Sequence, residues 1–332
     1  MLAKVIRQKN MEEFMQVIIG TDHLGEDYIR RLENKFPTVD FLDGINKSTI
    51  PEEFLLSEIY FGWPSSQQFL SLKKLKWIAC PGMGIDKIIK SDEILNSDVM
   101  ITNSPGTHVN PMADYTIGVM ISLAHRFLMC YEDQKLKFWS TEKYSSKIEE
   151  LSGKTLGIFG FGEIGKAIAR RAKSFDMEII VLDPNPKNIP NYVSNVLSST
   201  ELDQLCLVSD YLVVTAPIME STYNCIGEKQ LRLMKEGSFI VIVSRGGIVD
   251  EIALENNLKS GKLGGAALDA TVLEPLPQDS GLWDLDNIII TPHVSALSPE
   301  LYERRRVVFE ENLSRYISGE RLNFLCDKNL SY

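Results

Sequence analysis

The chain has 332 residues, which is enough for about two domains. Hydrophobic residues make up 44% and charged residues 24%, a composition that excludes disordered and fibrous chains. The net charge of −10 disfavours nucleic acids and anionic membranes as partners, because an acidic surface repels both. No apolar run has the length of a membrane span, and the N-terminus lacks the apolar segment of a secretory signal. The five scattered cysteines match no zinc or disulfide pattern, so we expect reduced thiols, no metal site and a cytoplasmic protein.

Strand-like and helix-like stretches alternate in the first part of the chain. Strand patterns occupy residues 14–19, 39–42, 58–61, 77–79 and 99–102, and helical patterns occupy residues 26–35 and 67–72. Pro111 then suits the first turn of a helix, and apolar side chains recur after it at helical spacing. We therefore predict one long helix over residues 111–137.

The alternation becomes sharper after residue 151. We predict strands at residues 155–159, 178–182, 212–215, 239–243, 265–268 and 288–290, and helices at residues 163–174 and 299–317. Strands that are each followed by a crossover predict a doubly wound parallel sheet, and hence an α/β fold.

A glycine-rich segment, Gly160-Phe161-Gly162-Glu163-Ile164-Gly165, lies between a predicted strand and a predicted helix. The spacing GxGxxG is a weak signal alone, but its position at this junction is typical of dinucleotide binding. Asp183 stands 18 residues after Gly165, at the end of the next predicted strand, where an acid can bind the ribose hydroxyls. A carboxylate there repels the 2′-phosphate of NADP, so we expect NAD, with Lys187 as the one nearby cation that offsets the repulsion.

Charged or titratable residues also follow three later predicted strands. They are Arg245 after residues 239–243, Asp269 and Glu274 after residues 265–268, and His293 after residues 288–290. The carboxyl ends of parallel strands are where open α/β sheets bind ligands. A histidine that donates a proton, a carboxylate that orients it and an arginine that holds a substrate carboxylate fit polar redox chemistry at a nicotinamide site.

At these residues the sequence resembles the D-isomer-specific 2-hydroxyacid dehydrogenase family. The resemblance extends from about residue 58 onward and includes Cys80-Pro81-Gly82-Met83-Gly84, the GxGxxG segment, Arg245-Gly246-Gly247, Glu274-Pro275 and Thr291-Pro292-His293. The last part of the chain, from Leu282-Trp283-Asp284 to His293 and then Asn312-Leu313-Ser314-Arg315-Tyr316, looks most like the branch that reduces glyoxylate, hydroxypyruvate and larger 2-oxo acids. One departure is Ala113-Asp114-Tyr115-Thr116, which stands where Ala-Glu-His-Thr is frequent.

The resemblance implies two Rossmann-like or flavodoxin-like domains with the active site in the cleft between them. Residues 1–102 and 299–332 would form the substrate-binding domain, and residues 103–298 the NAD-binding Rossmann domain. It also implies a homodimer that exchanges a hydride between a nicotinamide cofactor and a 2-oxo acid or D-2-hydroxy acid. We expect a small-molecule partner, and neither nucleic acid nor a membrane.

The resemblance assigns roles to individual residues. His293 would be the acid/base, Glu274 its orienting carboxylate and Arg245 the substrate-binding arginine, which with Gly82, Met83 and Gly84 would hold the substrate carboxylate. The expected cofactor-binding residues are Gly160, Phe161, Gly162, Glu163, Ile164, Gly165, Asp183, Ala216, Pro217, Ser244 and Asp269. Asp269 has a second interpretation, as a cap at the end of its strand.

A protein of another class remains open on the sequence. The C-terminal binding protein corepressors are non-enzymatic NAD-sensing proteins that share this fold and such a triad. They carry longer termini than this chain, which favours the enzyme. A third possibility is a dehydrogenase of one particular pathway, such as phosphoglycerate or phosphite oxidation.

Overall fold

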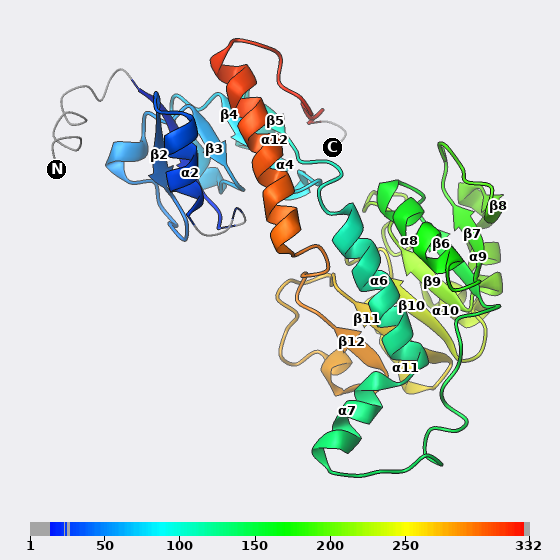
Figure 1. Cartoon of the computed structure of the whole chain (residues 1–332). Helices are drawn as coiled ribbons and strands as arrows, with labels where there is room; N and C mark the ends of the chain where they lie inside the picture. The colour runs from blue at the N-terminus through cyan, green and yellow to red at the C-terminus, as the bar shows by residue number, and fades with distance from the viewer. Residues whose placement is uncertain (1–13, 23, 25–26, 329–332) are drawn as a thin grey trace. The chain divides into compact units, whose positions relative to one another are not determined.

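The computed structural model describes residues 14–22, 24 and 27–328. The chain divides into two compact units, Met1–Thr107 with Ser298–Tyr332, and His108–Leu297 (Figure 1). Our predicted boundaries were residues 102/103 and 298/299. The substrate-binding and cofactor-binding roles of the two units remain predictions. Within the described residues, none of the helices combines the length and the apolar character that a membrane-spanning segment requires.

The first unit is built on a five-stranded sheet whose strands all run parallel. The strand order is β2-β1-β3-β4-β5, which is the flavodoxin-like order. All five strands lie where the sequence predicts them, with ends shifted by one residue at most. They are β1 (Met15–Ile19), β2 (Val39–Asp43), β3 (Ile59–Phe61), β4 (Trp77–Ala79) and β5 (Met100–Thr102).

Helices cover both faces of this sheet. On one face, α2 (Tyr28–Lys35) and the C-terminal helix α12 (Pro299–Ile317) enclose a core with strand residues such as Val17, Phe61 and Trp77. The alternate strand residues, such as Ile18 and Ile78, face a second core. That core is shared with η1 (Glu52–Phe54), α3 (Ser66–Ser71), α4 (Asp86–Ile89) and α5 (Asp92–Leu95).

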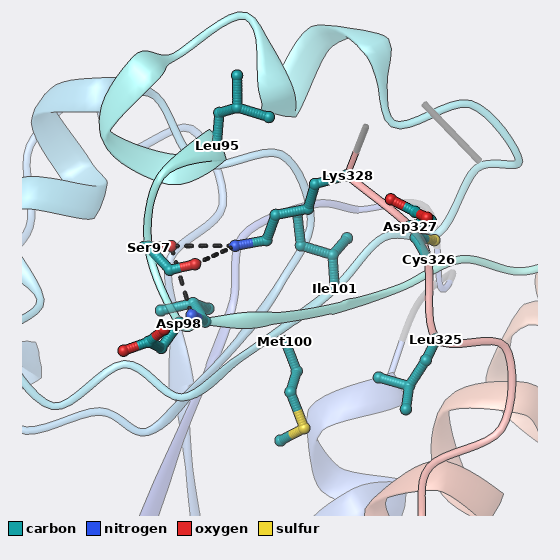
Figure 2. Close-up of a pocket in the computed structure, with 10 residues that line it drawn as sticks. Leu95, Ser97, Asp98, Met100, Ile101, Leu325, Cys326, Asp327 and Lys328 are labelled. Carbon is teal, nitrogen blue, oxygen red and sulfur yellow. Dashed lines mark hydrogen bonds between the residues drawn. The ribbon is translucent and has the colours of Figure 1, made fainter. Parts of the chain in front are cut away.

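After α12 the chain returns to the open edge of this sheet. Leu325 forms an antiparallel bridge with Thr102, and the Cys326 amide donates to the Ile101 carbonyl at 2.9 Å. Lys328 donates to the carbonyls of Ser97 and Ile94, and these segments border a hollow beside β5 (Figure 2). The segment after α12 therefore pairs with β5 over a short stretch.

The second unit contains a seven-stranded parallel sheet of order β12-β11-β10-β9-β6-β7-β8. Counted from its own first strand, β6, this is the 3-2-1-4-5-6 order of a Rossmann fold with one strand added. The strands are β6 (Thr155–Phe159), β7 (Glu178–Leu182), β8 (Val193–Leu197), β9 (Tyr211–Val214), β10 (Ser238–Ile242), β11 (Leu263–Leu268) and β12 (Ile288–Ile290). The prediction of two parallel α/β domains is confirmed.

Two cores again flank the sheet. The first lies under α6 (Val109–Ala124) and α8 (Glu163–Lys173). The second lies under α9 (Leu202–Val208), α10 (Glu228–Leu233) and α11 (Glu251–Lys259), with the turns η2 (Ser199–Glu201) and η3 (Gly281–Asp284) connecting strands nearby. This three-layer arrangement leaves the carboxyl ends of the strands to the loops that carry the predicted site.

The prediction of one helix over residues 111–137 was wrong. Helix α6 ends at Ala124, Arg126 has a left-handed backbone with φ of 56°, and α7 (Phe127–Lys135) starts again in a new direction (Figure 1). The Arg126 guanidinium donates to the carbonyls of Gly264 and Lys147. These hydrogen bonds to distant segments stabilise the left-handed conformation of Arg126 that separates the two helices. Strand β8 was missed because it is an edge strand with exposed polar residues.

Candidate active site

The glycine-rich loop connects β6 to α8 and has the geometry of a phosphate cradle. Gly160 has a φ of 97°, and a Cβ atom on it would lie 2.5 Å from the Ala216 amide nitrogen. A Cβ on Gly165 would lie 2.4 Å from the Gly160 carbonyl oxygen. By contrast, apart from Gly162 and its two chain neighbours, no described residue has a heavy atom within 4 Å of a Cβ on Gly162. The loop is thus tightly packed below and open at Gly162, beside the N-terminus of α8, where backbone N–H groups attract phosphate.

Asp183 follows β7 and is joined to this loop. Its Oδ2 accepts a hydrogen bond from the Phe161 amide at 2.7 Å, and its Oδ1 accepts one from the Asn185 amide at 2.9 Å. From the other neighbouring strand, the Thr215 hydroxyl donates to the Gly160 carbonyl at 2.5 Å. The carboxylate is therefore held at the mouth of the loop by two backbone donors.

The other predicted cofactor residues lie around the same strand ends. Phe161 and Ala216 are buried, and Pro217 is exposed. Ile164 packs against the core, whereas Glu163 points outward and pairs with Lys166. Ser244 Oγ, beyond the end of β10, is buried and has no hydrogen-bond partner among the described residues. A polar atom of this kind fits a bound group that would complete its hydrogen bonding.

His293 and Glu274 form a hydrogen-bonded pair. The His293 Nδ1 atom lies 2.7 Å from Glu274 Oε1. The two side chains remain 42% and 28% exposed, respectively, so the imidazole is open to a ligand. Because the carboxylate engages Nδ1, Nε2 is the nitrogen left to exchange a proton with a substrate.

Asp269 holds the segment that carries His293. Its side chain is 2% exposed, and its Oδ1 accepts hydrogen bonds from the Thr291 hydroxyl at 2.6 Å and the Val294 amide at 2.8 Å. Its Oδ2 accepts from the Ser295 amide at 2.9 Å. His293 sits between these donors with a left-handed φ of 56°. The bonds fit the second interpretation of Asp269, as a cap, and its contact with the nicotinamide remains a prediction.

The loops that carry Arg245 and Glu274 approach each other very closely. A Cβ atom on Gly246 would lie 2.0 Å from the Thr271 carbonyl carbon, so only glycine fits there. Glu251 accepts a hydrogen bond from the Val272 amide at 2.6 Å, and burial raises the pKa of this carboxyl. Arg245 is half-buried, and its guanidinium donates to the Ser244 carbonyl at 2.8 Å. The close packing of the two backbones thus fixes the positions of the loops that carry Arg245 and Glu274.

The predicted carboxylate-binding loop belongs to the first unit. Asn103 donates its side-chain amide to the Met83 carbonyl at 2.8 Å, and the Ser104 amide donates to the Gly82 carbonyl at 2.9 Å. The Cys80 thiol lies 3.8 Å from the Gly84 carbonyl oxygen. The loop is therefore braced by the residues that follow β5.

Comparison with known proteins identifies the family. Residues 117–295, more than half of the chain, match the family described as "D-isomer specific 2-hydroxyacid dehydrogenase, NAD binding domain". The chain belongs to this family. The match to a family of dehydrogenases favours the enzyme over the corepressor-like alternative.

Individual known proteins resemble most of the chain. A D-3-phosphoglycerate dehydrogenase of Methanocaldococcus jannaschii is 32% identical over 311 residues, which cover 92% of this chain and 58% of that protein. A hydroxypyruvate reductase of Thermotoga maritima is 36% identical over 73% of this chain and 77% of its own length. The TT0316 protein of Thermus thermophilus, a solved structure, has a TM-score of 0.81 and 28% identity over 94% of this chain and all of its own. Other solved structures with this fold contain NADPH or NAD, so the fold alone does not decide between them.

The geometry also includes residues to which the sequence analysis assigned no role. Thr291, Glu251 and Thr215 each hold a loop of the site through the hydrogen bonds described above. Their positions in the sequence could have indicated a role, because each residue stands directly after a strand or at the start of the helix that follows one. Tyr115 also reaches this site, because its hydroxyl lies 2.7 Å from Thr291 Oγ1. It was noted only as a departure from the family pattern.

Proposed function

We propose that the protein is an NAD-dependent reductase of small 2-oxo acids, which also oxidises the corresponding D-2-hydroxy acids. The observation that carries this proposal is the 2.7 Å contact between His293 and Glu274 at the carboxyl end of a Rossmann sheet. In a member of this dehydrogenase family, such a pair provides the acid/base that carbonyl reduction needs.

His293 and Glu274 divide the proton chemistry between them. Glu274 accepts the Nδ1 hydrogen of His293, which fixes the ring orientation and leaves Nε2 directed away from the carboxylate. When bound, a reduced nicotinamide would supply the hydride for the carbonyl carbon in the reductive direction, and its oxidised form would accept the hydride in the other direction. His293 gives the proton on Nε2 to the carbonyl oxygen, so that the C=O group becomes an alcohol. In the oxidative direction, the same nitrogen takes the proton from the hydroxyl.

Arg245 is proposed to hold the substrate carboxylate, because a guanidinium matches a carboxylate with two parallel hydrogen bonds. The Gly82, Met83 and Gly84 backbone is proposed to add N–H donors to the same carboxylate, a role that rests on the family resemblance. Ser244 and the open face of Gly162 support a bound dinucleotide, since both offer groups or space that such a ligand would use.

NAD is the proposed cofactor. Asp183 is anchored by two backbone amides, so its negative charge stays at the loop where an adenosine ribose would lie. A 2′-phosphate at that position meets a fixed carboxylate, and Lys187 is exposed on the segment that follows. The ribose hydroxyls of NAD meet a hydrogen-bond acceptor instead.

A homodimer and a cytoplasmic location are also proposed. The dimer is supported by large exposed apolar side chains on α7 and the loop after it, including Phe138 and Trp139. The location is supported by the five cysteines, all of which are free thiols.

The decisive experiment is an assay of 2-oxo acids of increasing side-chain size, glyoxylate and hydroxypyruvate among them, with NADH and with NADPH. We expect NADH oxidation with at least one of them. His293→Gln should lower kcat by about two to four orders of magnitude, the usual scale of general acid catalysis. Its affinity for NADH, measured by fluorescence titration, should remain, because the substitution leaves the glycine-rich loop intact. Turnover close to wild type in His293→Gln would refute the assignment of the acid.

A further inference from the structure

Tyr115, Thr291 and Asp269 form a chain of hydrogen bonds across the second unit. Tyr115 projects from α6, and its hydroxyl lies 2.7 Å from Thr291 Oγ1, although the two residues are 176 positions apart. Thr291 Oγ1 lies 2.6 Å from Asp269 Oδ1. A half-buried tyrosine on the long helix is thus connected to the buried carboxylate beneath the His293 segment.

The direction of these hydrogen bonds follows from their chemistry. An ionised carboxylate only accepts, so the single hydroxyl hydrogen of Thr291 is used on Asp269. Thr291 Oγ1 can then only accept from Tyr115, whose phenol must donate. Burial raises the pKa of Tyr115 to about 12, and the charge of Asp269 adds to the rise. The phenol therefore remains a donor throughout the neutral range.

Asp269, the last member of this series of hydrogen bonds, holds the backbone around His293. Asp269 accepts the amides of Val294 and Ser295, directly after His293, and the Thr291 hydroxyl, two residues before it. The His293 amide in turn donates to the Thr291 carbonyl at 2.9 Å. These bonds enclose the one residue of the segment 291–295 that has a left-handed φ. Such a conformation is unfavourable for a residue with a Cβ and persists when its neighbours hold it.

We propose that Tyr115 is a positioning residue for His293, which acts through Thr291 and Asp269 to hold the segment 291–295 in its catalytic conformation. The inference rests on the proposed function of His293 as the acid. It assigns a task to a tyrosine that stands where histidine is frequent in the family.

The first test measures backbone protection without any ligand. Hydrogen–deuterium exchange, followed by mass spectrometry of a peptide covering residues 291–297, is compared between the wild type and Tyr115→Phe. Loss of the phenol hydroxyl should speed exchange of this peptide by about tenfold, because its amides open with the segment. Unchanged exchange would overturn the proposal.

The second test is kinetic and uses the 2-oxo acid that the wild type reduces best. Tyr115→Phe should lower kcat by about tenfold and leave KM within about twofold, since a displaced acid affects the chemical step more than binding. Thr291→Val should do the same, and Thr291→Ser, which keeps the hydroxyl, should restore turnover. The double variant Tyr115→Phe with Thr291→Val should be no slower than Thr291→Val alone, because the two act through one chain. If the losses of kcat in the two single variants simply add in the double variant, the two residues do not act through one series of hydrogen bonds, and the proposal fails.

Tyr211→Phe is the matched control. Tyr211 also donates to a carboxylate, Glu149, at 2.9 Å, but from the first residue of β9, at the opposite end of the sheet from the predicted site. Its removal should cost stability without changing kcat or the exchange of residues 291–297. An equal loss of kcat in Tyr211→Phe would mean that the Tyr115 effect is general destabilisation, and the proposal would fail. If the wild type reduces no 2-oxo acid, the proposed function fails, and the exchange experiment still decides the structural part.

Discussion

At the level of single residues, His293 depends on two carboxylates that act on different atoms. Glu274 contacts Nδ1 of the imidazole ring, whereas Asp269 contacts the surrounding backbone and Thr291. A left-handed backbone costs a residue with a Cβ about 1–2 kcal/mol. Hydrogen bonds to a charged acceptor contribute about 1.5–3 kcal/mol each, which is enough to offset that cost.

Cofactor choice is a second property that we propose to depend on one residue, Asp183. Asp183→Asn should narrow the ratio of kcat/KM for NADH over NADPH by about tenfold, which corresponds to about 1.4 kcal/mol. The asparagine keeps an oxygen that can accept from the Phe161 amide but removes the charge that repels a 2′-phosphate. The measurement is kcat/KM with both cofactors for the wild type, Asp183→Asn and Asp183→Ala.

Asp183→Ala removes the acceptor together with the charge, so it also loosens the loop. If kcat/KM with both cofactors falls in the alanine variant but not in the asparagine variant, the hydrogen bond of Asp183 to the loop and the repulsion of a 2′-phosphate by its charge are separate effects. If the wild type already prefers NADPH, the charge of Asp183 does not govern the choice.

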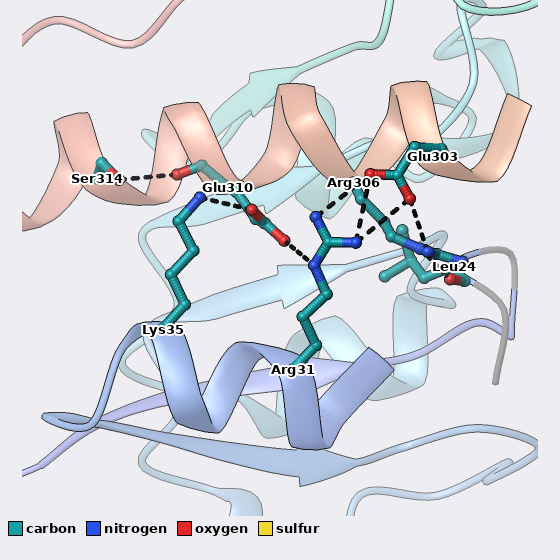
Figure 3. Close-up of polar contacts among 7 residues, drawn as sticks. All are labelled: Leu24, Arg31, Lys35, Glu303, Arg306, Glu310 and Ser314. Carbon is teal, nitrogen blue, oxygen red and sulfur yellow. Dashed lines mark hydrogen bonds and ion pairs between the residues drawn. The ribbon is translucent and has the colours of Figure 1, made fainter. Parts of the chain in front are cut away.

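At the level of elements, α12 is joined to the first unit by packing and by ion pairs. Phe309 packs against Phe61, with ring centroids 4.7 Å apart, in the core beneath α12. On the side of α12 that faces α2, the Glu310 carboxylate contacts Lys35 at 2.6 Å and Arg31 at 3.2 Å (Figure 3). Glu310 is almost fully buried, whereas its partners are about half exposed. The pairs thus connect two helices that lie more than 260 residues apart in the chain.

Glu310→Gln should lower the stability of the first unit by about 1–2 kcal/mol. The substitution leaves two cations without their buried partner, but their exposure lets water compensate part of the loss. The measurement is urea-dependent hydrogen exchange of the β1–β3 amides, because it reports on this unit separately from the other.

Glu303→Gln provides the control on the same helix. Glu303 also pairs with Arg31, and with Arg306, but its side chain is 48% exposed, so the change should stay within about 0.5 kcal/mol. An equal effect of the two substitutions would show that burial of Glu310 contributes nothing.

At the level of the whole molecule, the exposed apolar side chains of residues 127–148 are the feature that points to assembly. Single exposed apolar residues are ordinary, but a cluster of them along one short segment of the chain favours an interaction surface. The cluster comprises Phe127, Leu128, Tyr131, Leu136, Phe138, Trp139 and Ile148. Helix α7 and the loop after it, which contain these residues, project away from the sheet of their own unit (Figure 1).

The protein should sediment as a dimer at micromolar concentration. Leu136→Glu, at a side chain that is 75% exposed, should shift it towards the monomer, because a charge in an apolar interface stays unpaired. Leu207→Glu is the control, since Leu207 is 50% exposed on α9, outside this cluster, and should leave the dimer intact. A wild type that sediments as a monomer would refute the homodimer.

Much of the second unit followed from local sequence. The buried strands have short apolar runs, and the glycines of the GxGxxG segment are required by close backbone contacts at Gly160 and Gly165. Placement of charged residues at strand ends was sufficient to nominate His293, Glu274 and Arg245, because parallel strands bring their carboxyl ends to one edge. Their catalytic roles remain predictions that the proposed variants test.

The sequence by itself determined the fold class, most of the strands and the segment that forms the glycine-rich loop, because these depend on periodicity and on backbone freedom over a few residues. Only the tertiary structure decided that α6 ends at Ala124, that Asp269 holds the backbone around His293, and that Tyr115 reaches Thr291. Each of these depends on a hydrogen bond or a packing contact between segments far apart in the chain. Such a contact exists only once the helices have packed on the sheet, and no local pattern encodes it.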